Sequence, residues 1–242
     1  MTSTRPLPAD SSAGHPEQTV YFNELAELFA VFADDTDVIY RPWLDAVLPA
    51  AGGSAVDLGC GSGRWTGLLM DRYDQVLGVD IADREIDMAR AAHPRAEFGV
   101  RNLLDLTPET DGRFDLVFSV NTVHHLRDHD RVLPHLRSLV APGGRAVVID
   151  VTDPGGWGTM DYQVADAFRD AEESYRLRSR DYRIAAKVLE LHLHPAWLDH
   201  AVNDVPLTRP SFYSHYSQAF PGAEFTDLHR VVTAMHWTNR ER

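Results

Sequence analysis

The sequence has little cysteine, little lysine and no long apolar run. Cys60 is the single cysteine among 242 residues, which excludes a disulfide within the chain. The apolar stretches are strand-sized, well short of the roughly 20 residues that a membrane-spanning helix needs, and the first residues lack the apolar segment of an export signal. We therefore expect a cytoplasmic protein with no membrane partner.

Positive charge is also scarce. Asp and Glu number 36 against 23 Lys and Arg, which gives a formal net charge of −13, and Lys187 is the single lysine. So acidic a surface repels polyanions, and nucleic acid is not an expected partner. The preference for arginine over lysine is typical of GC-rich genomes, which points to a bacterium with specialised metabolism.

We expect one domain preceded by a disordered arm. Residues 1–18 are rich in Ser, Thr, Pro and Ala and have no apolar segment. The rest of the chain is long enough and apolar enough for a single domain over residues 19–242. Two stretches with apolar residues at helical spacing, 21–35 and 39–53, predict helices that lead into the core.

Strand-like and helix-like segments then alternate from residue 54 to residue 151. Apolar segments such as "FDLVFSV" and "GRAVVIDV" are typical of buried strands, and amphipathic segments such as "DREIDMARAAH" separate them. This α/β alternation predicts a mostly parallel sheet covered by helices on both faces. Ligands bind such sheets beyond the carboxyl ends of the strands.

The pattern changes after the fifth predicted strand. Residues 153–220 are charged and helical in pattern, with prolines between the helices, and are expected to form an inserted helical lid. Two β-rich runs, 223–232 and 233–237, follow and are expected to complete a seven-stranded sheet with an antiparallel final strand. A homodimer through the first helices or the lid is a further expectation.

Three glycines alternate with other residues in "VDLGCGSGRW". Gly59 allows a tight turn after the strand, Gly61 exposes backbone N–H groups to a ligand, and Gly63 opens the next helix. Arg64 stands where a dinucleotide-binding fingerprint would have its third glycine. A carboxylate at Asp57 would repel a pyrophosphate and attract an ammonium or sulfonium group. The loop therefore favours a cationic nucleoside over NAD.

Asp80 ends the second predicted strand, where its carboxylate can accept hydrogen bonds from ribose hydroxyls. Together, "VDLGCGSG", "VLGVDI", "VRNLLDL", "FDLVFSVNTVHHL" and "LVAPGGRAVVID" resemble the class I S-adenosylmethionine-dependent methyltransferases, in particular their small-molecule branch. The resemblance covers residues 50–151. It implies a Rossmann-like fold, S-adenosylmethionine as cofactor and methyl transfer as activity.

The resemblance also implies a cofactor site. Asn102 stands where the family usually has an aspartate, and its side-chain oxygen can still accept a hydrogen bond from the adenine amino group. Asp80 would hold the ribose. The implied cofactor-binding residues are Asp57, Gly59, Cys60, Gly61, Gly63, Asp80, Ile81, Asn102, Leu103, Val120 and Asn121.

A general base is needed only where the acceptor carries a proton on the methylated atom. His124 and His125 follow the fourth predicted strand, where an acceptor could approach the methyl group. His194 and Tyr213 lie in the lid, whose aromatic and imidazole groups could enclose a flat acceptor. Local packing is the alternative role for all four. No metal site is expected, because His192 and His194 point apart on a helix.

The expected function is methyl transfer at oxygen, nitrogen or carbon of a small aromatic or polycyclic acceptor. Two alternatives keep the cofactor site but not the reaction. One is an enzyme that binds the cofactor and catalyses a cyclisation or rearrangement, and the other is a noncatalytic S-adenosylmethionine-binding module. A protein acceptor with a basic face is a further alternative.

Overall fold

The computed structural model describes residues 16–241. Most of the expected arm lies outside this range, and its last three residues, 16–18, begin a helix instead. Helix α1 (Pro16–Asp35) and helix α2 (Asp37–Val47) precede the sheet, as the apolar spacing predicts. No helix among the described residues is long and apolar enough to cross a membrane.

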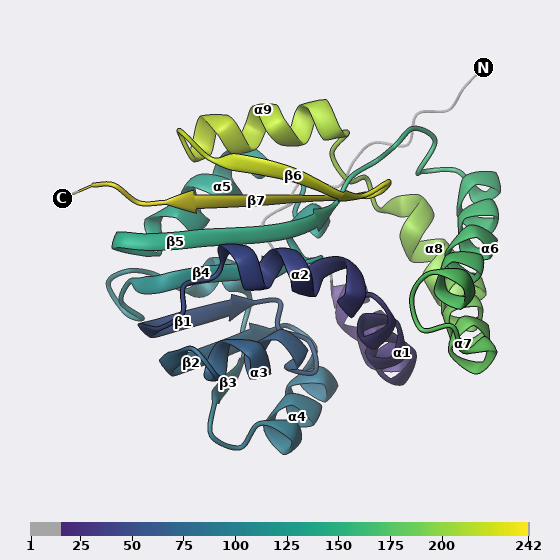
Figure 1. Cartoon of the computed structure of the whole chain (residues 1–242), viewed down its shortest axis with the longest axis horizontal. Coiled ribbons are helices and arrows are strands. Elements are labelled where there is room, and N and C mark those ends of the chain that lie inside the picture. The colour runs from purple at the N-terminus through teal and green to yellow at the C-terminus, as the bar shows by residue number, and fades with distance from the viewer. Residues whose placement is uncertain (1–15, 242) are drawn as a thin grey trace.

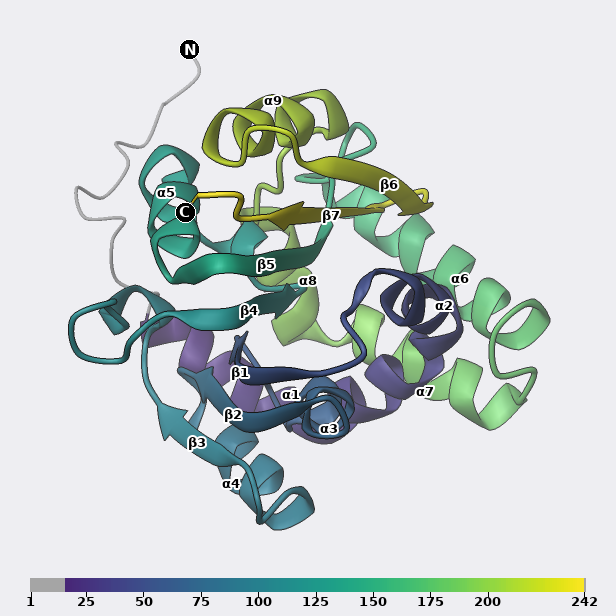
Figure 2. The same cartoon turned by 60° about the vertical axis from the view of Figure 1, so that its left-hand side comes forward.

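The sheet has seven strands in the order β3-β2-β1-β4-β5-β7-β6 (Figures 1 and 2). Strands β1 to β5 pair in parallel, and β7 runs antiparallel to both β5 and β6. This confirms the predicted Rossmann-like sheet. The strands are β1 (Gly52–Leu58), β2 (Tyr73–Asp80), β3 (Glu97–Val100), β4 (Phe114–Val120), β5 (Val140–Val151), β6 (Glu224–His229) and β7 (Val232–Thr238).

Helices cover both faces because alternate strand residues point to opposite sides. Leu116 and Phe118 belong to the core cluster beside α2 and α3, whereas Val117 belongs to the cluster beside α5 and α9. Both clusters are apolar and buried, so each face of the sheet forms its own core. The helices are α3 (Arg64–Met70), α4 (Asp83–Ala92), α5 (His129–Ser138) and α9 (Arg209–Ala219).

Three further helices stand beyond the carboxyl ends of the strands and form the lid (Figure 1). They are α6 (Met160–Arg176), α7 (Tyr182–Leu193) and α8 (Pro195–Asn203), and α1 packs against α7 and α8. The lid expected over residues 153–220 also included α9. That helix instead lies against α5, and its Phe212 and Tyr216 are buried in the core of the sheet.

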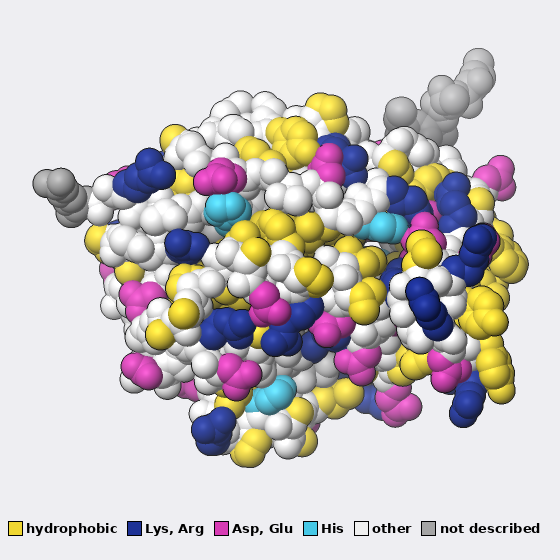
Figure 3. All heavy atoms as spheres, viewed as in Figure 1, with side chains coloured by type: hydrophobic (Ala, Val, Ile, Leu, Met, Phe, Trp, Pro, Cys, Tyr) yellow, Lys and Arg dark blue, Asp and Glu magenta, His cyan; other side chains and the backbone are white. Residues whose placement is uncertain are grey.

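The outer face of the lid is partly apolar. Phe168, Tyr175, Leu177 and Tyr182 are all more than half exposed. In Figure 3 apolar side chains gather along the edge of the molecule where α6 and α7 lie.

Candidate active site

A cavity of about 290 Å³ lies at the carboxyl ends of the parallel strands. The strand order reverses between β1 and β4, and α/β sheets bind ligands at such a switch point. The loops after β1, β2 and β4 form one wall, and α1, the lid helices and the β6–β7 turn form the others. Segments from the whole length of the described chain therefore meet at this cavity.

The glycine loop after β1 depends on backbone conformations that favour glycine. Gly59, Gly61 and Gly63 have φ angles of 71°, 50° and 82°. A Cβ at residue 59 would lie 2.1 Å from the Thr122 hydroxyl oxygen, so the loops after β1 and β4 touch here. A Cβ at residue 61 would meet no heavy atom closer than 3.5 Å. The missing side chain there leaves open space in the cavity.

Asp80 is fixed by the backbone around it. Its two carboxylate oxygens accept hydrogen bonds from Gly61 N–H (3.0 Å) and Ala82 N–H (2.9 Å), and its side chain lines the cavity. Burial raises the pKa of Asp80, although these backbone donors oppose the shift. Ile81 N–H is a third backbone donor to this carboxylate, which therefore keeps capacity for about one further donor. Glu85 of α4 also lines the cavity, and burial raises its pKa to about 7.

Asp57 lies behind the loop and does not line the cavity. It is 1% exposed and accepts a 2.6 Å hydrogen bond from the Thr66 hydroxyl on α3. Burial raises the pKa of Asp57 to about 7, and the Thr66 hydrogen bond only partly opposes this shift. The carboxyl group therefore ties β1 to α3 and does not line the cavity, contrary to the expectation from the sequence that it would attract the charged group of a ligand. Gly63, which precedes α3, is also outside the cavity lining.

The other expected cofactor residues line the cavity: Gly59, Cys60, Gly61, Asp80, Ile81, Asn102, Leu103, Val120 and Asn121. Asn102 caps a short 3-10 turn by accepting the Leu104 N–H at 2.9 Å, which leaves one lone pair on its side-chain oxygen. Asn121 has a φ of 53°, rare for a residue with a side chain. Its buried Oδ1 has no hydrogen-bond partner among the described residues.

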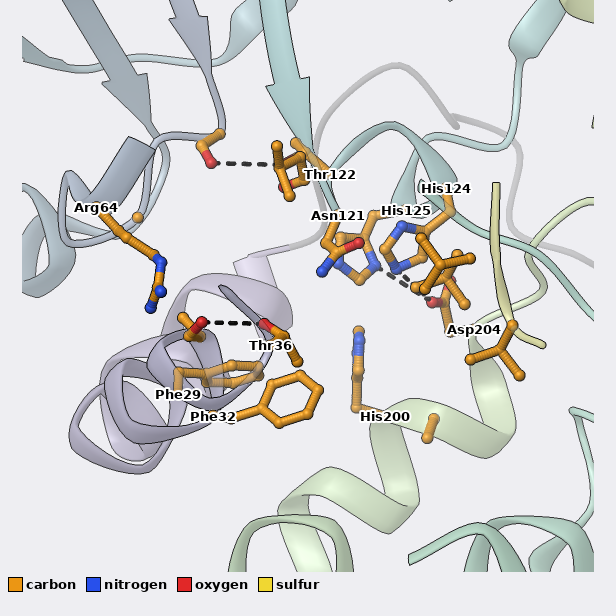
Figure 4. Close-up of a pocket in the computed structure, with 18 of the residues that line it drawn as sticks. Phe29, Phe32, Thr36, Arg64, Asn121, Thr122, His124, His125, His200 and Asp204 are labelled. Atoms are coloured by element: carbon orange, nitrogen blue, oxygen red, sulfur yellow. Dashed lines mark hydrogen bonds and ion pairs between the residues drawn. The ribbon is translucent and has the colours of Figure 1, made fainter. Parts of the chain in front are cut away.

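Two histidines and two aspartates meet on the far side of Asn121. His124 and His125 form a short 3-10 turn after β4. His124 Nδ1 lies 2.5 Å from Asp150 Oδ1 at the end of β5. His124 Nε2 and His125 Nδ1 lie 3.4 Å and 3.3 Å from the same oxygen, Oδ2 of Asp204, which follows α8 (Figure 4). The lid thus contributes a carboxylate to a pair of imidazoles on the sheet.

These charges shift one another's pKa values. Burial lowers the pKa of His124, but the carboxylates of Asp150 and Asp204 outweigh it and the net pKa is raised. Burial raises the pKa of Asp204, but the imidazoles of His125 and His124 outweigh it and the net pKa is lowered. Burial, with His125 nearby, lowers the pKa of His200 to about 3, so this ring is neutral at pH 7.

Aromatic side chains from the helices complete the cavity. Phe29 and Phe32 come from α1, and the His200 ring points from α8 towards His125 (Figure 4). Trp197 lies between the Phe29 and His200 rings, at centroid distances of 5.4 Å and 6.1 Å. This wall of the cavity therefore consists of aromatic rings, most of them apolar, together with the imidazole of His200.

Part of the chain that forms this cavity matches a known protein family. Residues 56–148 match a family described as "Methyltransferase domain". This part of the chain is therefore similar to the domain of class I S-adenosylmethionine-dependent methyltransferases. The cofactor of this family is S-adenosylmethionine.

Curated relatives of the methyltransferase domain act on different substrates. A trans-aconitate 2-methyltransferase of Methylobacterium radiotolerans is 38% identical over 92 residues, which is 37% of this chain and 35% of the relative. The O-methyltransferase cnsE of Penicillium expansum is 31% identical over 43% of this chain and 40% of its own. A tRNA (carboxymethyluridine(34)-5-O)-methyltransferase of Saccharomyces cerevisiae is 31% identical over 52% and 45%. The chain matches less than half the length of each.

Solved structures extend the likeness of fold to the lid. A chain described as a DhpI-SAM-HEP complex has a TM-score of 0.62 and 22% identity, over 94% of this chain and 99% of its own. A putative methyltransferase in complex with the Haloferax volcanii Trm112 activator has a TM-score of 0.60 and 15% identity, over 91% and 98%.

The residues of the methyltransferase domain fit the cofactor. The fixed Asp80 carboxylate has capacity for a ribose hydroxyl, and the bare backbone at Gly61 leaves room beside it. The buried, unpaired Oδ1 of Asn121 suits a donor such as an ammonium group. Together, these three features suit a ligand that has hydroxyl donors and a positive charge.

Two of the four expected catalytic residues lie outside the cavity. The His194 ring accepts the Ala196 N–H and caps the start of α8. The Tyr213 hydroxyl donates to Asp227 at 2.6 Å, and its ring packs against Phe225 beside the sheet. Both residues are therefore occupied by local structure. His124 and His125 are the expected catalytic residues that line the cavity.

Several residues that line the cavity were not expected from the sequence: Phe29, Phe32, Thr36, Tyr40, Glu85 and Asp204. Asp150, which contacts His124 from outside the lining, was not expected either. Asp150 could have been found from the sequence, because it stands near the end of an apolar strand, as Asp80 does. Asp204 could not, since its role depends on how the lid docks on the sheet.

Proposed function

We propose that this chain catalyses methyl transfer from S-adenosylmethionine to a small-molecule acceptor. The observation that carries the proposal is a single cavity with two chemically different ends. The glycine loop and Asp80 suit the cofactor at one end. At the other end, a histidine pair and an aromatic lid suit an acceptor.

The cofactor half of the cavity would hold the nucleoside by its polar groups. Asp80 would accept from a ribose hydroxyl, with Ile81 and Leu103 against the adenine, and Asn102 would use its remaining lone pair for the adenine amino group. Asn121 would accept from the ammonium group. When bound, S-adenosylmethionine supplies a methyl group on a positively charged sulfur.

The acceptor half favours a flat molecule. Phe29, Phe32 and Trp197 give apolar contact, and the lid covers the cavity on the side away from the sheet. Enclosure by the lid excludes water from the reacting atoms and holds the acceptor in line with the departing sulfur. An aromatic or polycyclic acceptor, methylated at oxygen, nitrogen or carbon, fits this wall.

The histidine pair is where the acceptor would lose its proton. His124 is held by Asp150, and His125 stands beside it with ring centroids 3.9 Å apart. An imidazole in this position can remove the proton directly as a general base. It can also act by holding a metal ion.

The test is an acceptor screen with S-adenosylmethionine, read by mass spectrometry. The proposal predicts a product heavier by one methyl group, formed in equal amount to S-adenosylhomocysteine. A product without S-adenosylhomocysteine would support a cyclase or rearrangement enzyme instead. Cofactor binding without turnover across small aromatic acceptors and basic proteins would support a noncatalytic binding module.

A further inference from the structure

The contacts around Asp204 are longer than charge-assisted hydrogen bonds usually are. His124 Nε2 and His125 Nδ1 lie 3.4 Å and 3.3 Å from one carboxylate oxygen. Charge-assisted N–H···O bonds measure about 2.7–2.9 Å, and the His124–Asp150 contact in the same cluster is 2.5 Å. Three potential ligand atoms therefore converge, all within 4.8 Å of one another.

The same separations suit three ligands of one metal ion. Histidine nitrogen and carboxylate oxygen bind Zn²⁺ at roughly 2.0–2.2 Å. Two ligands at that distance are about 3.4 Å apart in a tetrahedral site and about 3.0 Å apart in an octahedral one. The observed nitrogen–oxygen distances match the tetrahedral value.

Asp150 supplies the support that a metal-binding histidine needs. Ligand histidines usually donate their second ring N–H to a carboxylate, which fixes the tautomer and the ring orientation. Here Asp150 accepts from Nδ1 of His124 and also accepts the Val151 backbone N–H at 3.1 Å. In the neutral ring this arrangement places the proton on Nδ1, so that Nε2 of His124 is without a proton and lies near the point that His125 and Asp204 share.

We propose that His124, His125 and Asp204 bind a divalent first-row transition-metal ion, such as Zn²⁺ or Fe²⁺, which receives an oxygen atom of the acceptor. Two imidazoles and one carboxylate are a ligand set that suits these ions. Three protein ligands leave coordination positions for a substrate, and the site opens to the cavity.

This inference rests on the proposed function and narrows its acceptor. The acceptor would carry a hydroxyl, whose pKa would fall on coordination so that its proton could leave, or a carboxylate, which has no proton to lose. Because Asp204 follows the last lid helix while His124 and His125 follow β4, the ion would also join the lid to the sheet.

The experiment titrates Co²⁺ and Zn²⁺ into untagged full-length protein that has been stripped with a chelator. Co²⁺ binding is followed by visible absorption and Zn²⁺ binding by calorimetry. The variants are Asp204→Asn and His125→Gln, which each remove a ligand, and Asp150→Asn, which removes the support. His215→Gln is the matched control, because His215 pairs with Asp130 at 3.1 Å on the surface, away from the cavity.

We expect one ion per chain in the native protein and in His215→Gln. Affinity should fall about 10- to 100-fold in Asp150→Asn and further in the two ligand variants. Equal binding in Asp204→Asn and His215→Gln, or no binding by the native protein, would overturn the proposal. Titration of S-adenosylmethionine in the presence of chelator separates the proposed metal site from the proposed methyltransferase function. A stripped protein that binds the cofactor and methylates an acceptor would overturn the metal site and leave the methyltransferase function intact.

Discussion

Gly59 and Thr122 lie so close that a Cβ at residue 59 would be 2.1 Å from the Thr122 hydroxyl oxygen. The loop after β1 and the loop after β4 therefore touch through a position where only glycine fits. Because Asn121 lies next to Thr122 in the cavity wall, this contact sets the relative position of the cofactor and histidine ends of the cavity.

Gly59→Ala should therefore destabilise the protein more than the positive φ alone explains. Gly112 is the matched control, since its φ of 80° is similar but a Cβ there would meet nothing within 4 Å. We expect Gly112→Ala to cost about 1–2 kcal/mol and Gly59→Ala to cost about 1–3 kcal/mol more through overpacking. Urea unfolding measures both. Equal losses would mean that the contact with Thr122 has no consequence.

Asp57 should make the stability of the fold depend on pH. Its pKa is raised from 3.8 to about 7 by burial, so between these pH values the unfolded chain is ionised at this residue and the folded chain is protonated. Stability then falls as pH rises through this window, and the loss levels off above about pH 7.

The Asp57→Asn variant isolates this effect, because an amide has the same shape and its oxygen can still accept from Thr66. The stability of the variant relative to the native protein should increase from about pH 4 to about pH 7 and then stay constant. Urea unfolding across this range is the measurement. A difference that does not vary with pH would show that Asp57 is ionised throughout.

A buried ion-pair network joins α1 to the lid. Arg178 lies 2.8 Å from Asp35, at the end of α1, and 2.8 Å from Asp170 of α6, and all three side chains are buried. Arg178→Gln leaves two buried carboxylates without their cation, which should cost about 3–5 kcal/mol. It should also make the lid more susceptible to proteolysis.

Arg176→Gln is the control for this prediction. Arg176 makes an ion pair of the same 2.8 Å length with Glu172, but both side chains are more than 60% exposed. Such a surface pair contributes about 0.5 kcal/mol or less. If the two variants lost the same stability and showed the same cleavage pattern, the network would not be what fixes the lid.

Asp80 should matter for the cofactor more than for the fold. Asp80→Ala removes an acceptor for the ribose hydroxyls, and a charged hydrogen-bonding group contributes about 1.5–3 kcal/mol. Affinity for S-adenosylmethionine should therefore fall about tenfold or more. Asp87→Ala, on the exposed side of α4, is the control and should leave the affinity unchanged. Unchanged affinity in Asp80→Ala would contradict the assignment of this site.

The sheet and the cofactor end of the cavity could be predicted because local pattern decides them. Apolar strands such as β4 read directly from the sequence, and Asp80 ends a strand at the edge where ligands bind. Asp57 was harder, since the sequence does not reveal that its carboxyl group turns towards Thr66 and away from the loop.

The acceptor end could be predicted only in part, because it forms where distant helices dock. His124 and His125 follow a predicted strand, but Phe29 and Asp204 enter the cavity from α1 and from the end of the lid. Helix α9 has a proline in its first turn, as the lid helix α8 does, so its sequence does not separate it from the lid. The packing of α9 against α5, and the hydrogen bond from Tyr213 to Asp227 of β6, are properties of tertiary structure.

Calorimetric titration of the native protein with S-adenosylmethionine, S-adenosylhomocysteine and NAD tests the central claim most directly. The glycine loop, with Arg64 in place of the third glycine of a dinucleotide site, predicts that the first two bind one to a chain and that NAD does not bind. Binding of NAD alone, or of none of the three, would contradict the account of this cavity as a methyltransferase site.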